Sequence, residues 1–438
     1  MIRYLCMKIK NWYLQTIQGF GWLTGSTWRI LLFLLLCLCV IVFSAWHTER
    51  VICYVFGIQH TFGCTYFLFI LCGLVLMMHE TEYSWHQEWV RIPVGLLSVF
   101  MLYYCVLALV WLMFVGIFGL PINVDSYGTI FILICTCLIV LIGFVNTKTI
   151  RIVSHSLPMP GIQKPYHIVL ISDIHLGTFI KSGHVQRIVN AINKIRPDIV
   201  IIAGDLIDND GSSPQNDIEV SRVAHQLRNI LSPDGVILTL GNHDPVASNE
   251  YFLSFLQESN IKLLNNEVAE YPDFYIIGRT DPSRNLRKPI DDLICKCTKQ
   301  KPRIIVDHDP QYIDEAICCG ADLVLSGHTH AGQFFPASTA VRFVLGKEKF
   351  YGYHLIGKTH CIISAGAGVF NLPVRIGTRN EIVDITLEPI LIHRNYANRP
   401  QLEKDEETIT AFSDFADRRL SINHMKQERG RLEKQEWS

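Results

Sequence analysis

The sequence predicts an α/β domain with two packed mixed β-sheets flanked by helices, preceded by an α-helical membrane domain. Short runs rich in Val, Ile and Leu are typical of buried strands. They fall at residues 167–172, 198–203, 236–240, 303–306 and 323–325. Helical patterns such as 185–195 lie between some of them. Further strand-like runs occur at 274–277, 360–364 and 382–387. This is more strand material than one doubly wound sheet would need, which favours two sheets.

The first third of the chain is too apolar for a water-soluble domain. The 438 residues are 49% hydrophobic, and this excess is concentrated before residue 146. A membrane-spanning helix needs about 20 mostly apolar residues. Four segments approach that length: 30–46, 65–78, 94–118 and 127–145. The second is short unless it begins near Val51, and a signal peptide is the alternative interpretation of the first.

Basic residues indicate how the four predicted spans are oriented. Cytoplasmic ends of membrane helices are enriched in Lys and Arg. Four such residues precede the first span, at positions 3, 8, 10 and 29, and Lys148 and Arg151 follow the fourth. We therefore expect a multi-pass protein of the inner (plasma) membrane, with its N-terminus and catalytic domain on the cytoplasmic face. If the chain had one span fewer, the domain that follows the last span would lie on the opposite side of the membrane.

Composition along the chain divides it into five parts. Residues 1–29 form a basic N-terminal segment, and 30–146 the four-helix membrane domain. Residues 147–165 are predicted to be a linker, because Pro158, Pro160 and Gly161 interrupt regular structure. The catalytic domain is expected at 166–388. Residues 389–438 form a charged tail with few apolar side chains.

Cysteine usage and net charge restrict the class of protein. The soluble part holds an odd number of cysteines, including the adjacent Cys318 and Cys319, which favours a reducing compartment over a disulfide framework. Cys295 and Cys297 could form half of a zinc site, but no second pair of cysteines lies at a suitable distance from them. The net charge of -1 favours no nucleic-acid partner. The oligomeric state is left open.

Clusters of carboxylate, amide and imidazole side chains follow the predicted strands. They are Asp173 with His175, Gly204 with Asp205, the run Gly241, Asn242, His243 and Asp244, the single His308, and Gly327 with His328 and His330. Because each follows an apolar run, we expect them along one edge of the sheet material. Oxygen and imidazole donors without thiolates suit Mn²⁺, Fe²⁺ or Zn²⁺. The sequence therefore predicts a metalloenzyme with two metal ions.

Each of these residues also has a structural interpretation. Asp173 and Asp205 could be turn formers or helix caps, and His308 a satisfied loop histidine. Asp244 is expected to cap or pair locally, and Arg279 is a weak candidate for binding a substrate phosphate. An extra carboxylate at Asp307 could shift the metal preference. Five histidines lack a motif and are expected at the surface or in the core: His167, His184, His225, His354 and His360.

The ordered motifs resemble the calcineurin-like metallophosphoesterase superfamily. Asp-x-His, Gly-Asp-x-x-Asp, Gly-Asn-His-Asp, a lone His before a Pro, and Gly-His-Thr-His occur in that family's order over about residues 165–387. The run after His330, with Gly332 and Gln333, and the later run from Arg375 to Glu381 resemble the branch that acts near bacterial membranes.

The resemblance implies roles for nine residues. Asp173, His175 and His330 would hold one divalent ion, Asn242, His308 and His328 the other, with Asp205 between them. A metal-bridging hydroxide would attack the phosphorus, and Mn²⁺ is the favoured ion. The resemblance further implies that His243 acts as a general acid or binds phosphate. Asp208 would then orient His243.

The implied activity is hydrolysis of a phosphodiester or pyrophosphate bond. Attachment to a membrane makes a lipid-linked substrate attractive, because both partners are then confined to one surface. The family includes enzymes that cleave UDP-diacylglucosamine in lipid A synthesis, and nothing in the sequence selects that substrate. A protein phosphatase is the runner-up among enzymes. The competing class is a membrane scaffold that binds metal without catalysis, with the bilayer as its partner and the helices as an anchor.

Overall fold

The structure is a computed structural model of the full chain. It describes residues 88–120, 122–208, 217–284, 287–298 and 300–390, together with the single positions 42, 46, 49, 53 and 57. The predicted spans at 30–46 and 65–78, the basic segment 1–29 and the charged tail lie outside the described residues, apart from single positions and the tail's first two residues.

The first β-sheet is built mainly from the amino-terminal half of the α/β domain. In the described residues its strand order is β1-β12-β2-β3-β4-β5. The strands are β1 (Ile150–Met159), β2 (Tyr166–Ile171), β3 (Ile199–Ala203), β4 (Val236–Thr239), β5 (Ile261–Leu263) and β12 (Asn380–Pro389). β2 to β5 run parallel, whereas β12 pairs antiparallel with β2.

The second sheet is built from the carboxyl-terminal half and has the order β10-β11-β9-β8-β7-β6. Its strands are β6 (Glu267–Glu270), β7 (Tyr275–Arg279), β8 (Arg303–Asp307), β9 (Leu323–Ser326), β10 (Gly352–Ile356) and β11 (Thr359–Ile363). β7, β8, β9 and β11 are parallel, and the two outer strands are antiparallel. The expectation of two mixed sheets is confirmed.

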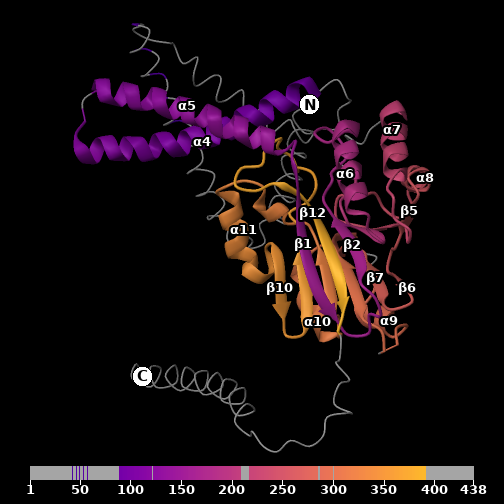
Figure 1. The fold of residues 1–438 in the computed structure, drawn as a ribbon. Helices are drawn as coiled ribbons and strands as arrows, with labels where there is room; N and C mark the ends of the chain where they lie inside the picture. Colours follow the sequence, from indigo (N-terminus) through magenta and orange to yellow (C-terminus); the bar gives the residue numbers. More distant parts are fainter. Residues whose placement is uncertain are drawn as a thin grey trace, which may run out of the picture. The chain divides into compact units, whose positions relative to one another are not determined.

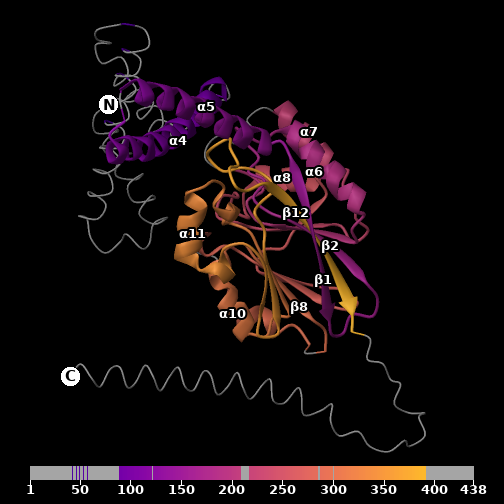
Figure 2. The ribbon, with the colours of Figure 1, turned by 60° about the vertical axis from the view of Figure 1, so that its left-hand side comes forward.

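Three apolar layers hold the sheets and helices together. Side chains alternate along β2, so that Ile168 and Leu170 face the second sheet while Val169 and Ile171 face helices. The helices on that outer face are α6 (Ser182–Ile195), α7 (Asp217–Arg228) and α8 (Glu250–Glu258). The other outer face is covered by α9 (Ile290–Ile294) and α10 (Ile313–Cys318). Figures 1 and 2 show this arrangement from two sides.

The predicted linker at 147–165 is wrong for most of its length. Residues Ile150–Met159 form β1, which pairs along its whole length with β12. β1 is an edge strand, and Pro158 is tolerated there because its missing N–H has no neighbour on that side. The strand side chains Leu157 and Met159 are buried. The α/β domain therefore begins near residue 150, and its last strand ends at Pro389.

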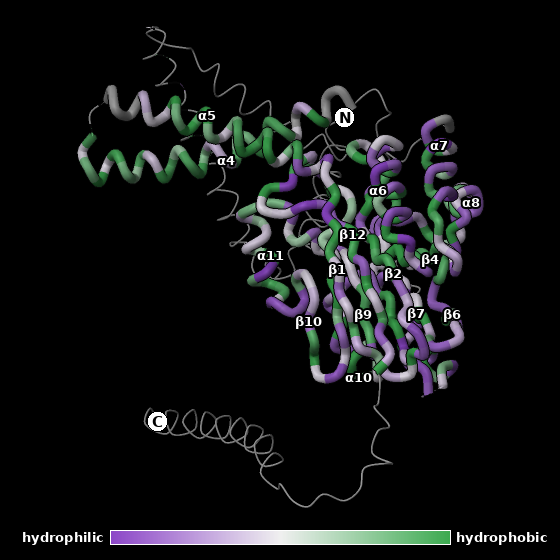
Figure 3. Tube along the Cα trace, in the orientation of Figure 1, coloured by the Kyte–Doolittle hydropathy of each residue, from purple (hydrophilic) through white to green (hydrophobic). Residues whose placement is uncertain are grey.

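Two long helices precede the α/β domain. They are α4 (Glu88–Phe118) and α5 (Ile122–Asn146), and within them Gly95–Phe118 and Tyr127–Asn146 are long and apolar enough to cross a membrane. Only 17% and 28% of their most apolar stretches are buried, unlike the core helix of a soluble protein. Figure 3 shows that hydrophobic colouring predominates along both helices. These two spans match the third and fourth predicted segments.

Close packing joins this helix pair to the α/β domain. Val99 and Tyr103 of α4 and Ile139 and Val140 of α5 form one apolar cluster with Val374 and its neighbours Leu372 and Ile376. A Cβ at Gly143 would lie 2.5 Å from a side-chain carbon of Ile376, so only glycine allows α5 to approach this closely. The backbone N–H of Arg375 also donates to the carbonyl of Gly143 at 2.8 Å.

Candidate metal centre

The predicted ligands lie together at the carboxyl ends of parallel strands from both sheets. Asp173 and His175 follow β2, Asp205 follows β3, and Asn242 follows β4. From the second sheet, His308 follows β8, and His328 and His330 follow β9. Because the sheets pack face to face, these strand ends converge. The structure therefore brings together all seven residues expected to hold metal.

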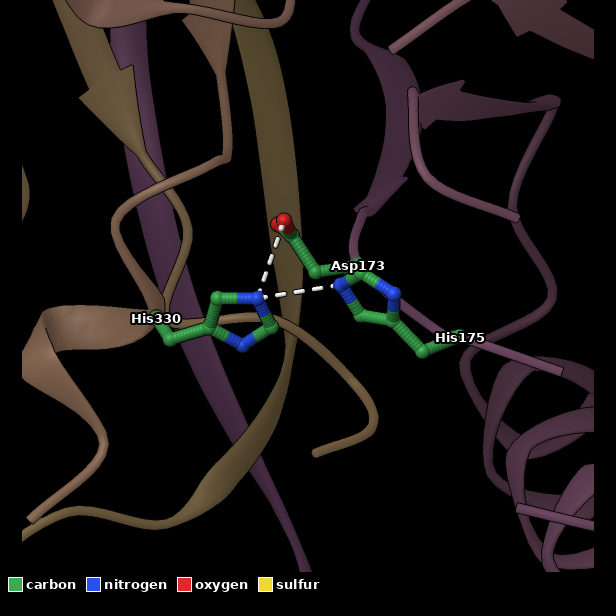
Figure 4. Close-up of side chains that lie close together, drawn as sticks. All are labelled: Asp173, His175 and His330. Atoms are coloured by element: carbon green, nitrogen blue, oxygen red, sulfur yellow. Dashed lines mark hydrogen bonds and ion pairs between the residues drawn. The ribbon is translucent and has the colours of Figure 1, made fainter. Parts of the chain in front are cut away.

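One group of donors consists of Asp173, His175 and His330, all of which are buried. Nε2 of His330 lies 3.1 Å from Nε2 of His175 and 3.4 Å from a carboxylate oxygen of Asp173. Figure 4 shows the two imidazoles and the carboxylate directed at one another. Nitrogen and oxygen atoms that converge in this way offer three ligands to one divalent cation.

A second group is formed by Asp205, His308 and His328, with Asn242 beside them. Nε2 of His308 is 3.1 Å from a carboxylate oxygen of Asp205. The amide oxygen of Asn242 lies 3.1 Å from that same nitrogen and 2.9 Å from Nδ1 of His328. Asp205 is also 3.7 Å from Nε2 of His175, so it lies between the two groups.

The tautomer of His308 fits a cation at this site. Its Nδ1 lies 2.7 Å from the carbonyl oxygen of Ala203, which can only accept, so Nδ1 carries a proton. In the neutral ring the lone pair of Nε2 then faces the oxygens of Asp205 and Asn242. Three lone pairs directed at one point repel one another unless a proton or a metal ion lies between them. The donor set therefore fits the metal centre that the sequence predicts.

The electrostatics of the cluster favour positive charge. Burial by itself lowers the pKa of His175, but the hydrogen bond and charge of Asp208, with Asp205 and Asp173, raise it to about 9. Burial opposes ionisation of Asp205 as well, yet His308 and His175 hold the pKa of its carboxyl well below its usual range. Three neighbouring carboxylates thus stabilise cationic charge inside a buried site.

Backbone strain is concentrated at these residues. Asp173, His175, Asp205, His328 and His330 all have φ between 51° and 69°. Non-glycine residues rarely adopt this left-handed conformation, and each instance costs on the order of 1–3 kcal/mol. Five strained residues at one sheet edge must be held by the surrounding structure. The strain directs their side chains inward, and such clusters are typical of functional sites.

Asp244 fixes the backbone around Asp205. Its carboxylate is fully buried and accepts four backbone N–H groups at 2.8 to 3.1 Å, from Asp205, Leu206, Ile207 and Gly241. A Cβ at Gly241 would lie 2.2 Å from a carboxylate oxygen of Asp205, so only glycine fits there. The expected local pairing of Asp244 is confirmed for Gly241 only, because the other three donors lie 37 to 39 residues earlier in the chain. Together the four bonds place Asp205.

His243 and Asp208 lie beside the first group of donors. Nδ1 of His243 is 3.4 Å from a carboxylate oxygen of Asp208, which is equally distant from Nδ1 of His175. The side chain of His243 is 29% exposed, whereas that of His175 is buried. His243 is therefore the more accessible of these two imidazoles, and its protein-side nitrogen already has a carboxylate partner.

Phe370 was not anticipated from the sequence. Its ring centroid lies 5.1 Å from that of His175, 4.7 Å from His243 and 5.9 Å from His330. It packs against all three imidazoles. An isolated Phe in a Gly-rich loop carries no chemical signal, so no sequence pattern could have identified it.

Arg375 links this site to the apolar helix α5. Its guanidinium is fully buried and donates to the carbonyls of Ala365, Gly368 and His330. Nη2 is also 3.4 Å from Nδ1 of His330. The backbone of Arg375 binds α5 in turn, because its carbonyl accepts from the Asn146 side chain at 3.0 Å. Arg375 therefore connects the end of α5 with one of the candidate ligands.

The suggestions for Arg279 and Asp307 are wrong. Arg279 is 1% exposed and pairs with Asp307 at 3.2 Å and Glu315 at 3.0 Å, so it is not directed toward a substrate. Asp307 is also bound by Arg287 at 2.7 Å. The carboxylate of Asp307 therefore pairs with Arg279 and Arg287 and is not available to a metal ion.

Comparison with known proteins agrees with this geometry. Residues 166–332 match the family model described as calcineurin-like phosphoesterase. A zebrafish (Danio rerio) protein named transmembrane protein with metallophosphoesterase domain is 31% identical over 283 residues, or 59% of this chain and 62% of its own length. An uncharacterized metallophosphoesterase of Helicobacter pylori strain J99 is 33% identical and covers 52% of this chain and 61% of its own.

A third relative matches almost over its full length. An uncharacterized metallophosphoesterase of Aquifex aeolicus is 27% identical over 252 residues, which is 56% of this chain and 94% of the relative. By contrast, the chain spans about 60% of the length of the zebrafish and Helicobacter relatives.

Fold and site together resemble those of metal-dependent phosphoesterases. Two sheets with oxygen and imidazole donors at their shared edge, and relatives named metallophosphoesterases, agree on this class. More particularly, residues 166–332 are similar to calcineurin-like phosphoesterases. That family carries a dinuclear metal centre, and the two groups of donors described above are its candidates here.

Proposed function

We propose that this chain is a membrane-attached phosphoesterase that uses two divalent ions to hydrolyse a phosphodiester or pyrophosphate bond in a lipid-linked substrate. The observation that carries the proposal is the convergence of seven donor side chains beside two apolar helices. The donor side chains support the proposed chemistry, and the apolar helices support the proposed location of the substrate.

We assign the ligands by the two groups of donors. Asp173, His175 and His330 would hold one ion, and Asn242, His308 and His328 the other, with Asp205 shared. This assignment is supported by the position of Asp205, within 3.7 Å of a nitrogen from each group. When bound, a pair of such ions supplies activated water and stabilises negative charge on phosphoryl oxygens. Mn²⁺ is our favoured ion, with Fe²⁺ and Zn²⁺ as alternatives.

His243 would protonate the leaving group or bind its phosphate. In its favour, it is the partly exposed imidazole beside the donors, and Asp208 contacts its Nδ1. If that nitrogen carries a proton toward Asp208, Nε2 is the atom presented to a substrate. Burial lowers the pKa of His243, which makes its protonated form a stronger acid toward a departing oxygen.

A lipid-linked substrate is supported by the short path between site and helices. Phe370 packs on three imidazoles of the site, and Leu372, Val374 and Ile376 of the same loop pack on α4 and α5. A substrate head group at the metal centre would therefore lie close to the bilayer in which these helices are embedded. UDP-diacylglucosamine is one candidate of this class, and its cleavage is the narrower form of the proposal.

Metal content and hydrolysis measured together test the proposal. The full-length protein in detergent should bind about two equivalents of Mn²⁺ and hydrolyse bis-p-nitrophenyl phosphate. His308→Ala should lose metal and activity. His225→Ala is the matched control, because that imidazole lies on α7 and outside the donor groups, and it should retain both. Full metal content in His308→Ala would contradict the ligand assignment.

The alternative classes give different results in the same assays. A scaffold would bind metal but hydrolyse neither the diester nor a lipid pyrophosphate. A protein phosphatase would prefer p-nitrophenyl phosphate and phosphopeptides. Hydrolysis of phospholipids or cyclic nucleotides in place of nucleotide-linked lipids would exclude the narrower substrate while retaining the class of reaction.

We further propose four spans, an inner-membrane location and a catalytic domain on the cytoplasmic side. The basic residues Lys148 and Arg151 after α5 support that orientation. In sealed inverted membrane vesicles, which expose the cytoplasmic side, added protease should cleave the catalytic domain. Cleavage restricted to right-side-out spheroplasts would place the domain on the opposite face.

A further inference from the structure

Helix α11 presents an uncovered apolar face next to the membrane helices. It spans Ala337–Leu345, and none of its residues is buried. Phe343 is 90% exposed, Val344 50%, and Phe335, two residues before the helix, 55%. Ala340, Phe343 and Val344 share one side, because residues three and four apart on a helix are neighbours. A soluble surface would leave this face in contact with water at a cost.

The residues just before α11 contact the candidate membrane span of α4. The hydroxyl of Tyr103 donates to the carbonyl of Phe335, and the N–H of Phe335 donates to the carbonyl of Ile376 at 3.0 Å. Tyr103 lies about two turns beyond Gly95, the first residue of its candidate span, which is about 12 Å along the helix. Phe335 therefore contacts the first half of the candidate span, on the side of α4 that faces the α/β domain.

Charge at the end of α11 fits a phospholipid surface. Arg342 is exposed within the helix, and Lys347 and Lys349 follow it, with Glu348 as the acidic neighbour and Asp314 paired with Lys349. Apolar side chains flanked by basic ones are typical of helices that lie in the plane of a membrane surface. Anionic head groups attract such lysines and arginines.

We propose that α11 and Phe335 insert into the boundary between head groups and acyl chains of the bilayer, next to the metal centre. The occupant of this face is thus an anionic phospholipid surface. The segment begins directly after His330 and Gly332 of the site, so insertion would hold that edge of the metal centre against the membrane. The inference depends on the membrane attachment in the proposed function, but not on hydrolysis.

Photocrosslinking tests the contact without any measurement of activity. Benzoylphenylalanine replaces Phe343 in the full-length protein, reconstituted in vesicles of phosphatidylglycerol and phosphatidylethanolamine and irradiated. The matched control places it at Leu231, which is 66% exposed between α7 and β4. We expect phospholipid adducts at position 343 and none above background at 231. Equal yields, or adducts at 343 only with protein, would overturn the proposal.

A charge substitution tests the consequence for substrate access. Phe343→Asp should leave hydrolysis of soluble bis-p-nitrophenyl phosphate unchanged, because α11 buries no side chain in the domain. For a substrate held in vesicles, kcat/KM should fall by about tenfold, the factor equivalent to ~1.4 kcal/mol. Leu231→Asp should change neither. An equal loss on both substrates would indicate misfolding, and no loss on vesicles would contradict the role of α11.

If neither substrate is hydrolysed by the wild type, the proposed activity fails while the crosslinking result still decides the position of α11. Carbonate extraction of wild-type membranes supplies the remaining control. Protein released by carbonate would show that the membrane attachment itself is wrong, and the insertion of α11 would be excluded with it.

Discussion

Replacing Asp244 by Asn should destabilise the protein and empty the metal centre. Each carboxylate oxygen of Asp244 accepts two backbone N–H groups, from Asp205 and Gly241 on one side and from Leu206 and Ile207 on the other. An asparagine amide keeps only one oxygen. Whichever way it is turned, two buried N–H groups face an NH₂ group and lose their acceptor.

The magnitude follows from the number of bonds lost. Each buried donor without a partner costs about 1–3 kcal/mol, so two cost roughly 2–6 kcal/mol. For a domain of this size, that lowers the midpoint of thermal unfolding by on the order of 10 °C. In either orientation the lost bonds hold the strained backbone of Asp205 or the two residues directly after it, so the metal content should fall as well.

Thermal unfolding of the metal-loaded protein in detergent and metal analysis of the same sample measure both effects. Asp309→Asn is the matched control, since Asp309 is also a buried aspartate at this sheet edge. It accepts one backbone N–H, from Gln311 at 2.9 Å, and asparagine can keep that bond. If Asp244→Asn unfolded within about 2 °C of wild type and kept its metal, the reasoning from hydrogen bonds would be refuted.

Four further predictions follow from other parts of the site. Arg375→Lys removes donors from three buried carbonyls, so the free energy of unfolding should fall by about 3 kcal/mol or more, and unchanged thermal unfolding would contradict this. Burial lowers the pKa of His184 from 6.5 to about 4, so its contribution to stability is complete above pH 6.5 and is lost as pH falls toward 4, by up to about 3 kcal/mol. His184→Gln, which can still donate to the carbonyl of Ala367, should unfold with a weaker dependence on pH in that window, and an unchanged dependence would exclude His184 as its source. His243→Asn should slow hydrolysis by about 10²-fold or more for poor leaving groups and much less for p-nitrophenol, while its metal content stays full. An equal loss of rate for both leaving groups would argue against proton donation by His243. Removal of metal by a chelator should lower activity and the unfolding temperature of the wild type, and Mn²⁺ should restore both, while His308→Ala should respond to neither treatment.

The regular α/β part of the fold could be predicted because local patterns and tertiary environment agree there. β2 and β3 are buried on both faces, so their unbroken apolar runs identify them as strands without further information. β1 could not be recognised in this way. It is stabilised by pairing with β12, more than 200 residues later, and Pro158 is harmless only because β1 lies at the edge of its sheet.

The same division applies to the site. The donors could be found from the sequence because polar residues directly after buried parallel strands must meet at one edge. Only the packing of the two sheets brings His328 to Asn242 and His330 to Asp173. The tertiary structure was also needed to show that Arg279 faces Asp307 and not the site.

By itself, the sequence determined which side chains carry the chemistry, since donor type and position after a strand are local properties of the chain. Only the tertiary structure decided what surrounds them: Asp244 behind Asp205, Phe370 against the imidazoles, and Arg375 between His330 and α5. These contacts join residues far apart in the chain, and their side-chain types are equally common in ordinary loops and cores. Their roles arise from packing, which no local pattern records.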